Sequence, residues 1–197
     1  MNSSVLLRPA RPSDAAIAAS LLHLSMGRTV DLFAEDGESE KLLSALFVRA
    51  GNRFSHQFGA ILEAEGKVVG LLLAYPAGRM PMLDLTTGLH LFLFLGFRKM
   101  LRLVQRMIPM MDVHEAERGE FYIGNVAVQP EFQGRGFGTR LISFAEEQAR
   151  GSGLKRCSLI VDANNGTALH LYQKIGYRIV FSGKHKSDYH RMVKDLV

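Results

Sequence analysis

The sequence has little cysteine: Cys157 is the only one in 197 residues. A single cysteine cannot form a disulfide within the chain, so we expect a reducing compartment such as the cytoplasm. Residues 1–9 also lack a charged start followed by an apolar stretch. No secretory signal is therefore predicted.

Long apolar runs, metal-ligand spacings and nucleic-acid motifs are missing as well. The apolar run 89–97 is shorter than the about 20 residues that cross a bilayer, so we expect no transmembrane segment. His, Cys and acidic residues do not cluster at ligand spacings, and we expect no metal. The net charge of +5 suits anionic ligands but is too diffuse to indicate nucleic acid.

The composition is that of a globular protein. Apolar residues make up 47% of the chain and charged residues 22%, which argues against disorder. A chain of this length suits one domain with a full core, and we expect a single domain over 1–197.

Hydrophobic periodicity and turn residues predict alternating strands and helices. Helices alternate with strands in the second half, which indicates an α/β fold with a partly parallel, mixed sheet. Strands are expected at 5–8, 58–64, 67–75, 121–128, 156–161, 177–182 and 189–197, and helices after 13 and at 39–48, 138–150 and 165–174.

A glycine-rich stretch from Gln133 to Gly138 follows a strand and opens a helix. Glycines let the backbone approach a ligand, and the free N–H groups of a first helical turn favour an anion such as a pyrophosphate. A Walker-type loop needs Gly-Lys-Ser/Thr and a dinucleotide fingerprint needs Gly-x-Gly-x-x-Gly, and neither spacing is present. A plain glycine turn before a helix remains the alternative.

These residues resemble the Gln/Arg-x-x-Gly-x-Gly/Ala signature of the GNAT (GCN5-related N-acetyltransferase) family, matched by Gln133, Gly136 and Gly138. The resemblance implies the GNAT fold: a central, twisted, mostly antiparallel sheet of about seven strands flanked by helices. It implies acetyl-CoA as co-substrate. The loop residues expected at its pyrophosphate are Gln133, Gly134, Arg135, Gly136, Gly138 and Thr139.

Two further stretches resemble the same family. Val126, Ala127 and Val128 occupy the strand whose backbone pairs with the pantetheine arm. Asn165 and Tyr172 match a second signature and lie two helical turns apart, so both can face one ligand. Tyr172 is our candidate general acid for the leaving coenzyme A sulfur. Packing against the coenzyme is the alternative role.

The general base is left open, because family members use different groups. The fifth-strand glutamate of some members is absent, since Ile160 stands near that place. The candidates are Glu120, His114, Glu115, Glu117 and His190.

A helical insertion at 77–119 separates the third and fourth strands, where family members have a short connection. Phe97, Met100, Leu101, Val104, Met107 and Ile108 recur at helical spacing, with Arg98, Arg102, Gln105 and Arg106 on the opposite face. This pattern predicts a basic amphipathic helix. It could cover the acceptor cleft, meet an acidic acceptor or an anionic membrane, join two copies in a homodimer, or simply present a solvated face.

The function expected from the resemblance is N-acetyl transfer from acetyl-CoA to a primary amine by direct attack in a ternary complex. The amine could belong to a small molecule or a peptide. A non-catalytic acetyl-CoA-binding regulatory module is the alternative, and transfer of a longer acyl chain is a third.

Overall fold

The computed structural model describes residues 5–27, 30, 38–107, 114–182 and 189–196. Seven strands form one sheet. The strands are β1 (Val5–Pro9), β2 (Gly59–Ala64), β3 (Lys67–Pro76), β4 (Phe121–Val128), β5 (Arg156–Asp162), β6 (Arg178–Ser182) and β7 (Tyr189–Asp195). The α-helices are α1 (Ala15–Met26), α2 (Ser39–Val48), α3 (Met80–Met107), α4 (Phe137–Gly151) and α5 (Gly166–Lys174). The predicted order of strands and helices is confirmed.

The strand order in the sheet is β1-β2-β3-β4-β5-β7-β6. Neighbouring strands are antiparallel except β4 and β5, which run parallel. The turn between β2 and β3 places Glu65 at φ 55° and Gly66 at φ 72°. Two successive residues with positive φ suit a tight two-residue turn between antiparallel strands.

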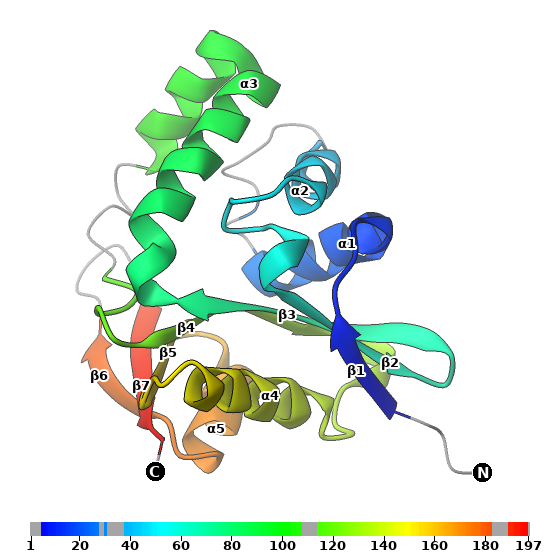
Figure 1. Cartoon of the computed structure of the whole chain (residues 1–197), viewed down its shortest axis with the longest axis vertical. Helices are drawn as coiled ribbons and strands as arrows, with labels where there is room; N and C mark the ends of the chain where they lie inside the picture. The colour runs from blue at the N-terminus through cyan, green and yellow to red at the C-terminus, as the bar shows by residue number, and fades with distance from the viewer. Residues whose placement is uncertain (1–4, 28–29, 31–37, 108–113, 183–188, 197) are drawn as a thin grey trace.

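Helices cover both faces of the sheet (Figure 1). Helices α4 and α5 lie on one face, and α1 and α2 lie on the other. Each face buries its own apolar core: Leu141 and Ile142 of α4 pack with β4 and β5, and Leu22 and Phe47 pack against β2 and β3. The structure therefore has the mixed α/β architecture expected of the GNAT fold, with α3 inserted between β3 and β4.

Helix α3 differs from the predicted insertion. It begins at Met80, well before the expected helix, and Pro81 is tolerated because it lies in the first turn. The backbone leaves helical geometry at Gly96 (φ 70°, ψ 173°), which divides α3 into segments 80–95 and 97–107. Figure 1 shows α3 rising away from the sheet.

The predicted basic side chains of this helix are exposed, whereas only part of its apolar side is packed. Leu103 is buried and Met100 packs beside it, but Phe97, Leu101 and Val104 are exposed. Apolar side chains therefore face both the core and the solvent. The placements expected for the side chain of Met107 and for Ile108 fall outside the described residues.

The apolar stretch is also longer than the sequence analysis recognised. Among the described residues, Ala77–Arg106 is long and apolar enough to cross a membrane by length and composition, and its most apolar 18-residue window has a mean hydropathy of 1.4. Only 17% of its most apolar window is buried inside the protein. The short run at 89–97 was therefore part of a larger apolar surface.

Candidate functional site

The centre of the sheet opens where β4 and β5 part. These parallel strands pair only from Phe121 to Ile123 on β4 and from Cys157 to Leu159 on β5. The register of β4 against β3 shifts between Ile123 and Asn125, so Gly124 forms a bulge. Beyond this bulge, no described strand pairs with the β5-facing edge of β4.

The predicted pantetheine strand lies along this open edge. The side chains of Val126 and Val128 pack toward α4, and Ala127 packs into the core on the α1 side. The side chains thus serve both cores, while one edge of the backbone stays available to an extended ligand. These residues can therefore pack into the core while their backbone pairs with a ligand.

The glycine loop connects β4 to the N-terminus of α4. Gly134 (φ 75°) and Gly136 (φ 80°) adopt left-handed backbone conformations that side-chain-bearing residues rarely take. A Cβ added at either glycine would meet nothing within 4 Å. Gly136 is the N-cap of α4 and no side chain caps the helix, so its first N–H groups can bind an anion.

Two predicted loop residues have contacts within the protein. The Gln133 side-chain amide donates a hydrogen bond to the Val128 carbonyl oxygen (3.0 Å), which fixes the loop to the end of β4. The Arg135 guanidinium donates to Glu65 in the β2–β3 turn (3.0 Å) and lies 5.0 Å from the centre of the Phe132 ring. Gln133 therefore shapes the loop, and Arg135 is an exposed cation beside it.

The second predicted motif lies against the first. A Cβ on Gly138 would lie 3.3 Å from Leu171, so glycine allows α4 and α5 to approach closely. The Asn165 side-chain oxygen accepts a hydrogen bond from the Ala168 N–H (3.1 Å) and caps α5. The loop residue Thr139 is half-buried on the first turn of α4.

Tyr172 is half-buried on α5 and packs against the core on the α4 side. Its ring centre lies 6.1 Å from that of Tyr177. Burial raises the pKa of the Tyr172 phenol to about 12, because the charged phenolate is desolvated. The phenol is therefore protonated near neutral pH and can act as a hydrogen-bond donor or an acid.

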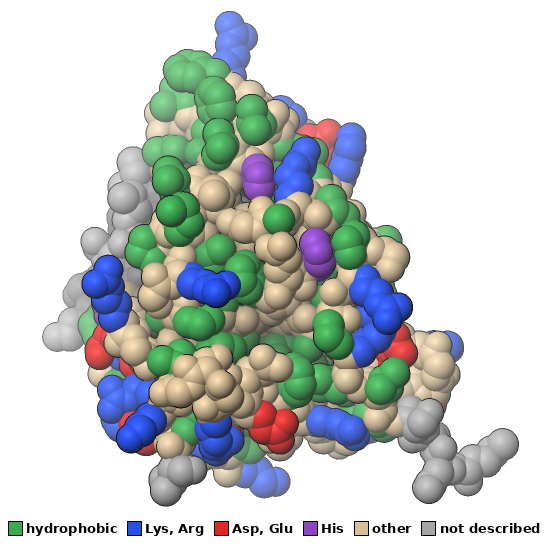
Figure 2. Space-filling view, viewed as in Figure 1, with side chains coloured by type: hydrophobic (Ala, Val, Ile, Leu, Met, Phe, Trp, Pro, Cys, Tyr) green, Lys and Arg blue, Asp and Glu red, His purple; other side chains and the backbone are tan. Residues whose placement is uncertain are grey.

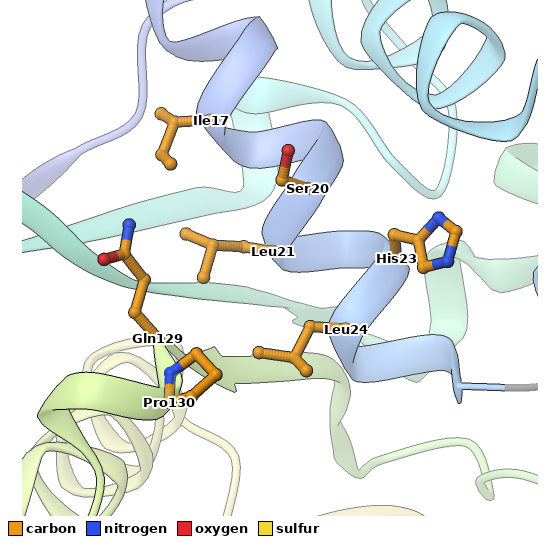
Figure 3. Close-up of a pocket in the computed structure, with 7 residues that line it drawn as sticks. All are labelled: Ile17, Ser20, Leu21, His23, Leu24, Gln129 and Pro130. Carbon is orange, nitrogen blue, oxygen red and sulfur yellow. The ribbon is translucent and has the colours of Figure 1, made fainter. Parts of the chain in front are cut away.

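An open hollow of about 310 Å³ lies between α1 and the residues that follow β4. Figure 3 shows Leu21 and Leu24 pointing from α1 toward Gln129 and Pro130. Most of its lining is apolar. Nearby, the Asn125 amide donates to the Ser25 hydroxyl (3.3 Å), which joins β4 to the end of α1 just after the bulge.

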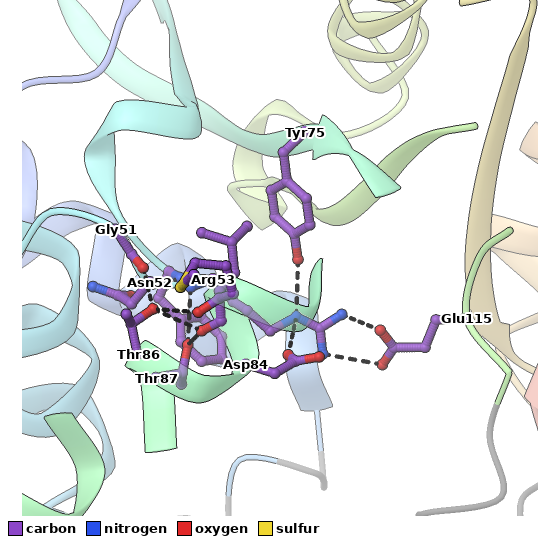
Figure 4. Close-up of polar contacts among 11 residues, drawn as sticks. Gly51, Asn52, Arg53, Tyr75, Asp84, Thr86, Thr87 and Glu115 are labelled. Atoms are coloured by element: carbon purple, nitrogen blue, oxygen red, sulfur yellow. Dashed lines mark hydrogen bonds and ion pairs between the residues drawn. The ribbon is translucent and has the colours of Figure 1, made fainter. Parts of the chain in front are cut away.

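A polar cluster that the sequence analysis missed lies on the other side of the bulge (Figure 4). The Arg53 guanidinium donates to the Tyr75 hydroxyl (3.0 Å) and forms ion pairs with Glu115 and with Asp84 (3.3 Å). It also lies 5.7 Å from the centre of the Tyr122 ring. These residues are far apart in the sequence, and no motif connects them.

This cluster attaches the insertion to the sheet. A Cβ on Gly124 would lie 3.3 Å from the Tyr75 hydroxyl, so the cluster abuts the β4 bulge. The Arg53 N–H donates to the Thr87 hydroxyl (3.0 Å), and the Thr86 hydroxyl donates to the Gly51 carbonyl oxygen. The base of α3 and the chain returning from it are thus held together beside the opening.

The surroundings of the cluster raise the pKa of Asp84 above its usual value. Desolvation raises the pKa of the Asp84 carboxyl, Arg53 lowers it and the nearby Glu115 raises it again, with a net increase. Burial likewise raises the pKa of Tyr75 and of Tyr122. The Arg53 guanidinium therefore interacts with two carboxyl groups and with the side chains of two tyrosines.

Among the candidate bases, the three glutamates already have arginine partners. Glu120 is buried and accepts hydrogen bonds from Arg191 at 2.7 Å on both oxygens, and Glu115 binds Arg53. The Glu117 side chain lies 3.6 Å from Arg191, and His114 is exposed. The Nδ1 of His190 is buried and has no hydrogen-bond partner among the residues that the structure describes.

Cys157 is buried in β5. Burial raises the pKa of its thiol to about 12, so the reactive thiolate is disfavoured. No group of three or more His, Cys, Asp and Glu side chains that could hold a metal occurs in the described part of the chain.

The family model described as "Acetyltransferase (GNAT) family" matches residues 26–177. This match includes the open strand edge, the glycine loop and α5. The chain therefore belongs to the GNAT acetyltransferase family.

Curated relatives named N-acetyltransferases match shorter stretches. GCN5-related N-acetyltransferase 6, chloroplastic, of Arabidopsis thaliana is 39% identical over 34% of this chain and 23% of its own length. Spermidine N(1)-acetyltransferase of Escherichia coli is 36% identical over 37% of this chain and 39% of its own length. The matched stretch thus covers well under two thirds of the length of each of these relatives.

Solved structures show the same fold over nearly the whole chain. An N-acetyltransferase from Staphylococcus aureus Mu50 superposes with a TM-score of 0.71 at 24% identity, covering 95% of this chain and 99% of that one. The PaiA N-acetyltransferase from Thermoplasma acidophilum, solved in complex with coenzyme A, gives a TM-score of 0.58 at 12% identity, covering 98% and 99%. At these identities the likeness concerns the fold.

Proposed function

We propose that this protein is an acetyl-CoA-dependent N-acetyltransferase that acts on a primary amine. The observation that carries the proposal is the open β4 edge, which leads from the Gly124 bulge to the uncapped N-terminus of α4. Family membership supports the acetyltransferase class. The identity of the amine is the part that needs experiment.

The residues present fit a coenzyme A pyrophosphate. The space around Gly134 and Gly136 is one that a Cβ would enter, and the N–H groups of the first turn of α4 lie at the positive end of the helix dipole. We propose that Gly134, Arg135, Gly136, Gly138 and Thr139 bind the pyrophosphate. Gln133 and Asn165 would act by shaping the loop and capping α5.

The strand edge and Tyr172 supply the other two functions. The backbone of Val126, Ala127 and Val128 can hydrogen-bond an extended pantetheine arm as an added strand would. Bound acetyl-CoA supplies an activated acetyl thioester and a thiol leaving group. Tyr172 holds a phenolic proton near neutral pH and would donate it toward the leaving sulfur during direct attack by the neutral amine.

The test is thiol release from acetyl-CoA with a panel of amines and peptides, including spermidine because one relative is named for it. Tyr172→Phe should lower turnover about 100-fold while leaving acetyl-CoA affinity, measured by calorimetry, nearly unchanged. Tyr177→Phe is the matched control, since it removes a neighbouring buried hydroxyl. Tight binding without thiol release across the panel would support a regulatory module, and unchanged turnover in Tyr172→Phe would remove the acid role.

A further inference from the structure

Helix α3 exposes large apolar side chains on both of its segments. Its exposed large side chains, called the α3 apolar face below, are Met82, Leu85, Leu89, Phe92, Leu93, Phe97, Leu101 and Val104. Leu85 and Leu93 are each 69% exposed and Phe97 is 72% exposed. Figure 2 shows hydrophobic side chains gathering over this upper part of the molecule. An exposed apolar surface of this kind indicates a binding partner.

The face follows helical spacing in both segments. In 80–95, positions 82, 85, 89, 92 and 93 recur at intervals of three and four, so they share one side of the helix. Leu83 and Leu91 on other sides are buried. In 97–107, Phe97, Leu101 and Val104 repeat this pattern. The exposed apolar side chains therefore form a surface that is separate from the apolar core.

The charges that α3 itself carries beside the face are basic, and one of them, Lys99, is paired with Glu38 at the start of α2 (3.1 Å). No Asp, Glu, Lys or Arg occurs between Asp84 and Arg98. The charged residues from there to the end of α3 are Arg98, Lys99, Arg102 and Arg106, all exposed, and none is acidic. Arg98 follows Phe97 and Arg102 follows Leu101, so basic side chains flank the apolar positions.

We propose that the α3 apolar face lies in the interface of an anionic lipid bilayer, with its side chains among the acyl chains and the flanking basic groups at the lipid phosphates. Apolar burial combined with attraction to anionic lipids is the pattern of interfacial amphipathic helices. The proposal is independent of the acetyl transfer, because it concerns where the protein is held.

The observations favour a membrane surface over a second copy of the chain. In a two-fold symmetric dimer, the same patch meets itself. Two α3 faces packed together would bring their basic flanks toward each other with no acidic residue from the distal part of α3 to offset them. A bilayer rich in anionic lipid supplies the missing negative charge.

The break at Gly96 favours lying on the membrane over crossing it. A span needs about 20 helical residues, and segments 80–95 and 97–107 are each shorter. The base of α3 is also held to the sheet by the Arg53 cluster, so the helix cannot leave the fold without losing those contacts. Figure 1 shows α3 on the side of the sheet opposite α4, so contact of α3 with lipid would leave the glycine loop accessible.

The first experiment uses the absence of tryptophan from the chain. Leu93→Trp places a single fluorophore on the α3 apolar face, and Val48→Trp places one on an exposed position of α2. Adding vesicles with about one third phosphatidylglycerol should shift the emission of Leu93→Trp to the blue and leave Val48→Trp unchanged, because only the first side chain enters lipid. No shift in Leu93→Trp, or an equal shift in both, would overturn the proposal.

Vesicle co-sedimentation separates the apolar and electrostatic parts. Leu89→Glu/Leu93→Glu should weaken binding about tenfold or more, while Leu6→Glu/Val48→Glu, with the same charge change at exposed sites elsewhere, should bind like the native chain. Arg98→Gln/Arg102→Gln should lose several-fold affinity for anionic vesicles relative to Lys41→Gln/Arg118→Gln. Circular dichroism checks that each variant is folded.

The remaining outcomes contradict the proposal. If the native chain ignores vesicles but forms dimers that Leu89→Glu/Leu93→Glu dissolves, the face is an interface between copies. If the bound protein resists alkaline carbonate extraction, α3 crosses the bilayer and does not lie on its surface.

Discussion

The region around the glycine loop and the inserted helix α3 are held in place in different ways. Strand β4, α4, β5 and α5 use residues close in sequence to form the site, with left-handed glycines and an open strand edge. The insertion is held by single residues from distant parts of the chain, such as Arg53 and Glu115, which are 62 positions apart. A local motif can be recognised in the sequence, whereas a distributed anchor appears only in three dimensions.

The two regions also differ in the chemical groups that they expose. The loop presents backbone N–H groups and glycines, which suit an anion, while α3 presents large apolar side chains, which suit a bilayer. We therefore expect substitutions in one region to leave ligand binding by the other region unaffected. The predictions below test that separation, beginning with the largest expected effect.

Gly136→Ala should weaken acetyl-CoA binding about tenfold. Alanine at φ 80° costs about 1–2 kcal/mol, which the loop would relieve by shifting its N–H groups. Gly78→Ala at the base of the insertion is the matched control, because its Cβ also meets nothing within 4 Å. Calorimetric titration measures both, and equal affinities in the two variants would contradict the proposed cradle.

Glu115→Gln should lower the free energy of unfolding by about 1–3 kcal/mol, because it leaves the largely enclosed Arg53 guanidinium without the carboxylate that accepts two of its hydrogen bonds. Asp84→Asn should change it by less than about 0.5 kcal/mol, since the Asp84 side chain is half exposed and solvent screens its ion pair with Arg53. Urea denaturation gives both values. A larger loss in Asp84→Asn would mean that Asp84 is the principal anchor of α3.

The smallest expected effect concerns the pH dependence of turnover. We expect no loss of turnover as the pH rises above neutral. The folded pKa of Tyr172 is raised to about 12, so its proton is fully present at pH 7 and is lost only as pH approaches that value. Turnover should therefore rise with pH as the acceptor amine becomes neutral, with no decline between about pH 7 and pH 10. A decline in native protein that disappears in Tyr172→Phe would show that burial does not raise this pKa.

The sequence predicted the strands, the glycine loop and the two motif helices because local physics determines them. Gly134 and Gly136 need a left-handed backbone, and Asn165 caps the helix that it begins. Helix α3 was only partly predicted. The sequence pattern predicted the helix from Phe97 onward but left open what its apolar side meets, and the structure places Phe97 and Leu101 in solvent.

The anchoring cluster could not be predicted. Arg53, Tyr75, Asp84 and Glu115 belong to four different elements or loops, and each is an ordinary residue in its local context. Their meeting depends on the paths of β3 and α3, which the sequence pattern does not specify. The same holds for the contact between Gly138 and Leu171, which brings the two motifs together.

The most direct test of this division of the molecule is amide hydrogen exchange with and without acetyl-CoA, analysed peptide by peptide. Acetyl-CoA should slow exchange in 124–128 along the open edge of β4 and in 133–139 at the loop, because the ligand would hydrogen-bond or cover these N–H groups. Exchange in 80–107 should stay the same. Protection confined to α3, or none at the loop, would contradict the assignment of the coenzyme site and the independence of the glycine-loop region and α3.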